Sequence, residues 1–113
     1  MQILENKKNR EEVFYLKYPF IQNDFIYIKD VANALLKVIK VNKGSIINVC
    51  SEKLTSNIDF IKKFKKISKR EIIINDNNKL NHKKKLYGSN KKLKSLGWSQ
   101  KYSLNKAFRE IIN

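Results

Sequence analysis

Short β-prone runs alternate with segments of helical period along this chain, and that alternation limits the fold more than any other feature. The runs are rich in β-branched and aromatic residues, as strands are. Four of them are expected to be strands: residues 13–16, 24–28, 45–50 and 71–75. The alternation predicts an α/β or α+β fold. A length of 113 residues suits one small domain or a piece of a larger one.

Each expected helix is preceded by a residue whose side-chain oxygen can accept a hydrogen bond from a free N–H group of the first turn. These residues are Asp30, then Thr55 or Ser56, and Ser103, while Ser89 begins a further short helix. Apolar residues recur at helical spacing after each of them. On the first helix they are Val31, Ala34, Leu35, Val38 and Ile39. That helix is expected to stop at Asn42-Lys43-Gly44, where Gly44 suits a left-handed cap.

Other segments carry weaker signals. Residues 1–12 are polar and charged, which predicts a short helix or a loose arm, and residues 76–85 are expected to form an exposed loop. Asp24 and Asp30 are expected to bind backbone groups rather than to do acid–base chemistry. Trp98 is expected in the core. Cys50 is expected to be a small, buried and inert hydrophobe.

The composition excludes several classes of site. One cysteine and one histidine, His82, exclude a disulfide framework and a Cys/His zinc cluster, and three glycines exclude a glycine-rich phosphate loop. The sequence contains no run of 18 apolar residues, so no transmembrane helix is predicted. The first residues lack an apolar region, so no secretory signal is predicted. The net charge is +15, but only three of the 25 basic residues are arginine. Because guanidinium forks are scarce and Lys, Asn and Ile are abundant together, we attribute much of the charge to A/T-rich coding DNA.

Three segments follow one another in a recognisable order. Residues 23–32 read N-D-F-I-Y-I-K-D-V-A, residues 46–51 read I-I-N-V-C-S, and residues 91–98 read K-K-L-K-S-L-G-W before Tyr102-Ser103-Leu104. They are similar to the motifs R-D-F-x-Y-V-x-D-V-A, x-Y-N-x-G-S and K-x-x-x-x-L-G-W-x-P-x-x-S-L. Together, over about residues 20 to 112, they resemble the extended short-chain dehydrogenase/reductases, the NAD-dependent nucleotide-sugar epimerases and dehydratases.

The resemblance implies an incomplete C-terminal half of such an enzyme, with the last Rossmann strands and helices plus the small substrate-binding lobe. Residues 1–113 would be one substrate-side segment, and the N-terminal dinucleotide-binding half, with its G-x-x-G-x-x-G loop, is absent. The complete enzyme would oxidise a sugar hydroxyl with NAD or NADP in the cytoplasm, and its products would feed surface polysaccharide synthesis. We expect this chain alone to hold no cofactor and no metal.

The resemblance also suggests residues that contact a nucleotide sugar. The family's arginine, which grips a diphosphate, is replaced here by the neutral Asn23. Asn48 could contact the nucleotide end, and a basic residue before the closing helix could contact phosphate. Lys83, Lys84 and Lys85 lie in that neighbourhood, although a solvated loop explains this run as well. These five residues are the substrate-binding candidates.

No residue is expected to be catalytic. Two Tyr-x-x-x-Lys matches occur, Tyr87 with Lys91 and Tyr102 with Lys106. A nearby ammonium lowers the pKa of a phenol and lets it transfer a proton. However, five tyrosines in a lysine-rich chain produce such matches by chance, and both lie beyond the place where the family carries its catalytic pair.

The leading hypothesis is therefore a nucleotide-sugar-binding part of an NAD(P)-dependent epimerase, dehydratase or reductase. Because strands taken from a parallel sheet expose hydrogen-bonding edges, we expect marginal stability, self-association or association with a separate Rossmann half. The alternative is a small basic module that binds nucleic acid or another polyanion, and a third hypothesis is a non-functional remnant. Neither a membrane nor a nucleic-acid partner is expected under the leading hypothesis.

Overall fold

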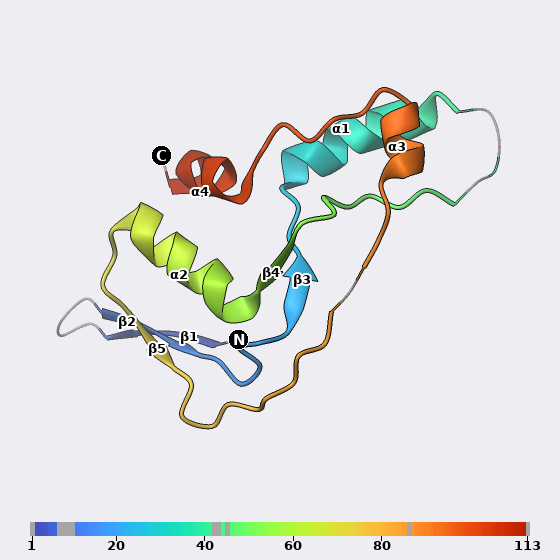
Figure 1. The fold of residues 1–113 in the computed structure, drawn as a ribbon. Helices are drawn as coiled ribbons and strands as arrows, with labels where there is room; N and C mark the ends of the chain where they lie inside the picture. Colours follow the sequence, from blue (N-terminus) through green and yellow to red (C-terminus); the bar gives the residue numbers. More distant parts are fainter. Residues whose placement is uncertain (1, 7–10, 42–43, 45, 86, 113) are drawn as a thin grey trace.

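The computed structural model describes residues 2–6, 11–41, 44, 46–85 and 87–112, and Figure 1 shows its strands and helices. The strands are β1 (Gln2–Asn6), β2 (Glu11–Tyr15), β3 (Gln22–Asp24), β4 (Leu54–Ser56) and β5 (Ile72–Asn75). The helices are α1 (Ile28–Ile39), α2 (Asn57–Ser68), α3 (Lys91–Ser95) and α4 (Leu104–Ile112). The predicted α/β class is confirmed.

A three-stranded sheet and one helix form the first core. β2 lies between β1, to which it is antiparallel, and β5, to which it is parallel. Phe14 and Leu16 of the β2 region pack against Ile72 of β5 and Ile61 of α2. Because Ile61 is only 1% exposed, α2 covers one face of the sheet. α4 packs against α2 in turn, where Phe108 meets Phe60 and Phe64 edge to face. The opposite face of the sheet leaves Ile73 exposed.

The second core lies around α1 and α3. The two-stranded β3–β4 sheet lies between it and the three-stranded sheet (Figure 1). Ala34, Leu93 and Trp98 are buried there, and Ile47 and Val49 pack against them. The indole Nε1 of Trp98 donates to the backbone oxygen of Asp30 at 3.0 Å. The expectation that Trp98 lies in the core is confirmed.

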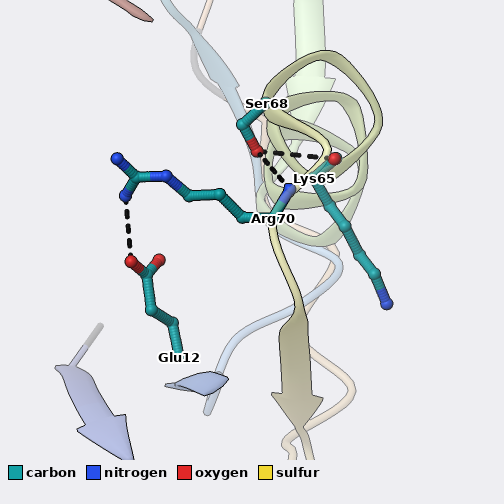
Figure 2. A network of polar contacts seen from close by, with 4 residues as sticks. All are labelled: Glu12, Lys65, Ser68 and Arg70. Carbon is teal, nitrogen blue, oxygen red and sulfur yellow. Dashed lines mark hydrogen bonds and ion pairs between the residues drawn. The ribbon is translucent and has the colours of Figure 1, made fainter. Parts of the chain in front are cut away.

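Polar contacts fix the end of α2 beside the sheet (Figure 2). Lys69 closes the helix in the left-handed conformation, and its N–H donates to the oxygen of Lys65 at 3.1 Å. Ser68 Oγ donates to the same oxygen and accepts from the N–H of Arg70. Arg70 Nη1 then reaches Glu12 Oε1 on β2 at 2.9 Å. The turn between α2 and β5 is therefore attached to the neighbouring strand.

The prediction for residues 1–12 was wrong, apart from Met1 and residues 7–10, which lie outside the described residues. The stretch contributes two paired strands, β1 and the start of β2, rather than a helix or a loose arm. Local polarity misled the prediction because the pairing partner supplies hydrogen bonds that a sequence window does not reveal.

The prediction for residues 24–28 was also partly wrong. Only the short β3 is a strand, and α1 begins at Ile28. Asp30 does not cap the helix: Tyr27 occupies the capping position without a side-chain hydrogen bond. Asp30 instead lies in the first turn and is fully buried. α1 ends at Ile39 with Lys40 as its C-cap, before the expected stop at Asn42-Lys43-Gly44, of which residues 42 and 43 lie outside the described residues.

The third predicted strand, residues 45–50, forms no strand over its described residues 46–50; Ser45 lies outside them. Ile47 and Val49 face the second core, whereas Ile46 is 86% exposed. None of the backbone hydrogen bonds of the described part pairs this segment with another strand. A strand requires a partner, and the described chain offers none here.

The remaining boundaries follow the sequence. Ser56 Oγ caps α2 by accepting from the N–H of Asp59 at 3.2 Å, and Ser103 Oγ accepts from the N–H of Lys106 at 3.2 Å before α4. β5 confirms the strand predicted at 71–75, shortened by one residue. α3 begins at Lys91 rather than at Ser89, and Gly97 follows it with a φ of 93°.

Candidate functional site

A cavity of about 470 Å³ opens beside the ends of β2 and β5 and the start of α2. Aromatic and amide side chains dominate its lining, together with one ammonium group. The lining residues are Tyr15, Leu16, Lys17, Tyr18, Phe25, Asn57, Phe60, Asn75 and Asn78. We call this the amide–aromatic cavity. Small-molecule sites are usually concave and lined by apolar and aromatic side chains with a few polar groups.

A chain of amides builds one wall of this cavity. Asn57, the first residue of α2, is held there because its N–H donates to the oxygen of Ile21 at 3.1 Å. Its side-chain Nδ2 donates to the oxygen of Tyr18, and its Oδ1 accepts from Asn23 Nδ2, both at 2.8 Å. The predicted residue Asn23 therefore lies behind the wall, on β3, and orients a residue that lines the cavity.

A second hollow, of about 550 Å³, is lined by residues of β3, β4 and α2 and of the loop before α3. Its cationic lining comes from Lys63, Lys83 and Lys85. The loop that carries Lys83 to Lys85 is fixed against β3, because the N–H of Gln22 donates to the oxygen of Lys84 at 2.9 Å. We call this the lysine hollow. Lys84 does not line it.

Asn48 lies apart from the other candidates. It is exposed on the irregular segment 46–50 and lines neither the amide–aromatic cavity nor the lysine hollow. The structure thus places Asn23 on β3 and the 83–85 loop beside the same strand, whereas Asn48 lines neither cavity. The assignment of substrate contacts to these five residues remains a prediction.

The two aspartates near these cavities bind backbone groups, as expected. The carboxylate of Asp24 accepts from the N–H of Ser51 at 3.0 Å and from the N–H of Glu52 at 2.8 Å. Glu52 has a φ of 65°, a left-handed backbone conformation that residues other than glycine rarely adopt. The hydrogen bond from its N–H to Asp24 stabilises that conformation. Asp30 accepts from Lys101 and Tyr102 N–H groups at 2.9 and 3.0 Å. These contacts occupy both carboxylates.

Neither Tyr-x-x-x-Lys pair has the geometry of a proton-transfer pair. Tyr87 is 78% exposed, at the surface with Lys91. Lys106 Nζ lies over the ring of Tyr102, 4.8 Å from its centroid, and donates to the oxygen of Lys101. The ammonium thus meets the face of the ring. The assignment of both pairs as chance matches remains a prediction.

Cys50 is a buried thiol whose chemistry is suppressed. Burial raises its pKa, and the charge of Asp24 raises it further. Since the thiolate is the reactive form, iodoacetamide at pH 8 should label the folded chain at least about tenfold more slowly than the chain in urea. Equal rates, followed by mass spectrometry, would contradict the burial.

The same shift predicts a dependence of stability on pH. The folded pKa of Cys50 lies above the unfolded value, so its contribution is complete below about pH 8.5 and is lost as the pH rises above it. Urea midpoints measured at pH 7.5 and pH 10 should differ less for Cys50→Ala than for the parent chain. An equal or larger difference in the variant would exclude the thiol as a source of the pH dependence.

Sequence reasoning missed most of the amide–aromatic cavity. Tyr15, Asn75 and Asn78 reach it from segments 60 residues apart, and the parallel pairing of β2 with β5 brings them together. The polar residues at the two strand ends were the available signal.

No group of three or more metal-ligating side chains occurs among residues 2–6, 11–41, 44, 46–85 and 87–112. Within the same residues, the helices are too short or too polar to cross a bilayer.

Comparisons with known proteins identify the fold. A scan against protein-family models found no match, and neither did a search of curated proteins. Among solved structures, RMD of Pseudomonas aeruginosa, complexed with NADPH, matches with a TM-score of 0.76 and 20% identity. The match covers 88% of this chain and 34% of that one.

Two further structures give the same picture. A putative epimerase from Burkholderia cenocepacia has a TM-score of 0.71 and 25% identity over 88% of this chain and 34% of its own. UDP-glucuronic acid 4-epimerase of Bacillus cereus, complexed with UDP-glucuronic acid and NAD, has a TM-score of 0.68 and 21% identity. That match covers 83% of this chain and 32% of the epimerase. The chain spans about a third of the length of these structures, and its fold is that of one part of the NAD(P)-dependent sugar-nucleotide epimerases and dehydratases that it matches.

Proposed function

We propose that this chain is the C-terminal, nucleotide-sugar-binding part of an NAD(P)-dependent epimerase, dehydratase or reductase, and that it does not catalyse the reaction alone. The observation that carries the proposal is that residues of α2 line both the amide–aromatic cavity and the lysine hollow, in a fold shared with such enzymes. As the resemblance implies, the complete enzyme would work in the cytoplasm and serve polysaccharide synthesis.

The lining of the amide–aromatic cavity suits a nucleoside. Tyr15 and Tyr18 offer exposed rings on which a base can stack. Asn57 and Asn78 carry amide groups that both donate and accept, as the edge of a base requires. Lys17 supplies one positive charge at the same cavity. A nucleotide is therefore a better match than an uncharged sugar alone.

The lysine hollow suits the phosphates. Lys83 and Lys85 face it from the loop beside β3, while Asn23 supplies no charge at the position of the family's arginine. Ammonium groups bind phosphate as point charges, without the paired hydrogen bonds of a guanidinium. We therefore expect weak, salt-sensitive binding of the sugar nucleotide.

The Lys83→Gln, Lys85→Gln double variant tests this assignment. It should weaken UDP-glucose binding by about tenfold, measured by calorimetry at low salt, because two attractive charges are lost near the phosphates. Lys84→Gln is the matched control, since it lies in the same run but does not line the hollow. If Lys84→Gln weakens binding as much as the double variant, the hollow has no special role.

The chemistry itself requires groups that the described residues do not bring together. The complete reaction needs a dinucleotide to accept a hydride and a base to remove the hydroxyl proton. Both Tyr-x-x-x-Lys pairs lie outside the amide–aromatic cavity and the lysine hollow. We propose that a separate Rossmann half completes the site.

A further inference from the structure

Three neighbouring hollows share one lysine and together form a basic trough. Lys63, on α2, lines the lysine hollow, a hollow of about 300 Å³ and a hollow of about 460 Å³. The trough runs from the 83–85 loop along α2 to α4. Its cationic residues are Lys53, Lys63, Lys66, Lys69, Lys83, Lys85 and Arg109.

The trough concentrates positive charge beyond the average of the chain. Seven cations line it against one carboxylate, Asp59, whereas the whole chain has 25 basic and 10 acidic residues. The ion pairs found among the described residues use other cations, namely Lys29, Arg70 and Lys79. The cations that line these hollows create a positive potential, which attracts an anion that spans them.

Two aromatic side chains lie along the same path. Phe20 lines the lysine hollow and Phe25 lines the 300 Å³ hollow. Phe25 already stacks on Phe60, with centroids 4.0 Å apart, whereas Phe20 lies under the Lys79 ammonium. A positive groove flanked by aromatic rings is the arrangement that binds single-stranded nucleic acid, because phosphates follow the charges and bases stack on the rings.

We propose that the trough binds the phosphate backbone of single-stranded nucleic acid without sequence preference. The distribution of charge supports this where the composition did not, because the fold gathers lysines that are scattered along the sequence. The amide–aromatic cavity shares none of the seven cations of the trough. The lysine hollow belongs to both proposals, so nucleic acid in the trough would compete there with the phosphates of the proposed sugar nucleotide.

The test is fluorescence anisotropy with a labelled 15-nucleotide RNA over a range of salt concentrations. Lys63→Gln, Lys66→Gln, Arg109→Gln removes three trough charges. It should weaken binding about ten- to a hundredfold at 0.1 M salt and reduce the slope of log K against log salt by about 2. The matched control, Lys40→Gln, Lys91→Gln, Lys94→Gln, loses the same charge from exposed positions around α1 and α3, and it should bind nearly as the parent chain does.

Two results would overturn the proposal. If the control triple variant weakens binding as much as the trough variant, only the net charge of the chain attracts RNA. A second arm uses inorganic polyphosphate, with Phe20→Leu as the variant and circular dichroism as the check of folding. Phe20→Leu should weaken RNA binding severalfold and leave polyphosphate binding unchanged. If Phe20→Leu changes RNA binding and polyphosphate binding by the same factor, the trough recognises phosphate alone.

Discussion

Asp30→Ala should destabilise the chain by about 2–4 kcal/mol, enough to unfold a small domain of marginal stability. Asp30 is fully buried, and its two carboxylate oxygens accept from the N–H groups of Lys101 and Tyr102. Alanine would leave both donors without a partner. The cost is the desolvation of two backbone groups rather than the loss of two ordinary hydrogen bonds.

The effect should be global, because Asp30 connects α1 to the segment between α3 and α4. Its backbone oxygen also accepts from Trp98, so the second core and the path to α4 meet at this residue. The measurement is the urea midpoint by circular dichroism. Asp30→Asn keeps one acceptor and should recover part of the loss, and Asp59→Ala, at an exposed position, should cost much less. A midpoint for Asp30→Ala equal to that of Asp59→Ala would show that the anchor contributes nothing.

The second large effect concerns association of the purified chain. One side of α1 is apolar and uncovered: Leu35, Leu36 and Ile39 are 54%, 60% and 76% exposed. With Ile28 they fall within an arc of about 100° at the helical period. Full burial of each such side chain contributes about 1.5–3 kcal/mol, so we expect self-association at micromolar concentration.

Ile39→Lys should weaken that association at least tenfold, because it places a charge in the apolar stripe. Ile111→Lys on α4 is the matched control, since Ile111 is 61% exposed on another helix. Sedimentation velocity of the two variants beside the parent gives the comparison. A parent chain that is monomeric at all concentrations and melts cooperatively at high temperature would contradict the need for a partner.

The sequence predicted the elements whose signals are local. Ser56 and Ser103 cap helices because capping depends on one side chain and the next turn. The apolar period identified α1, but only half of the predicted face, around Ala34, is covered. Leu35 and Ile39, on the rest of that face, are exposed.

The misses share one physical cause, which is dependence on distant pairing. Residues 2–6 form a strand because β2 supplies the partner. The largely apolar residues 46–50 form none, because no strand of the described part of the chain pairs with them. Asp30 was predicted to be a helix cap because the residues whose N–H groups donate to it, Lys101 and Tyr102, lie 71 and 72 residues away. The amide–aromatic cavity likewise depends on the register of β2 with β5.

The most direct measurement is a nuclear magnetic resonance titration of the ¹⁵N-labelled chain with UDP-glucose and, separately, with NAD. A substrate-side part without a dinucleotide site should show shifts from UDP-glucose at Tyr18, Asn57 and Asn78. NAD should cause no comparable shifts, either at these residues or elsewhere in the chain. The chain alone should convert no UDP-glucose. Tight binding of NAD, or turnover of UDP-glucose by this chain alone, would contradict the account.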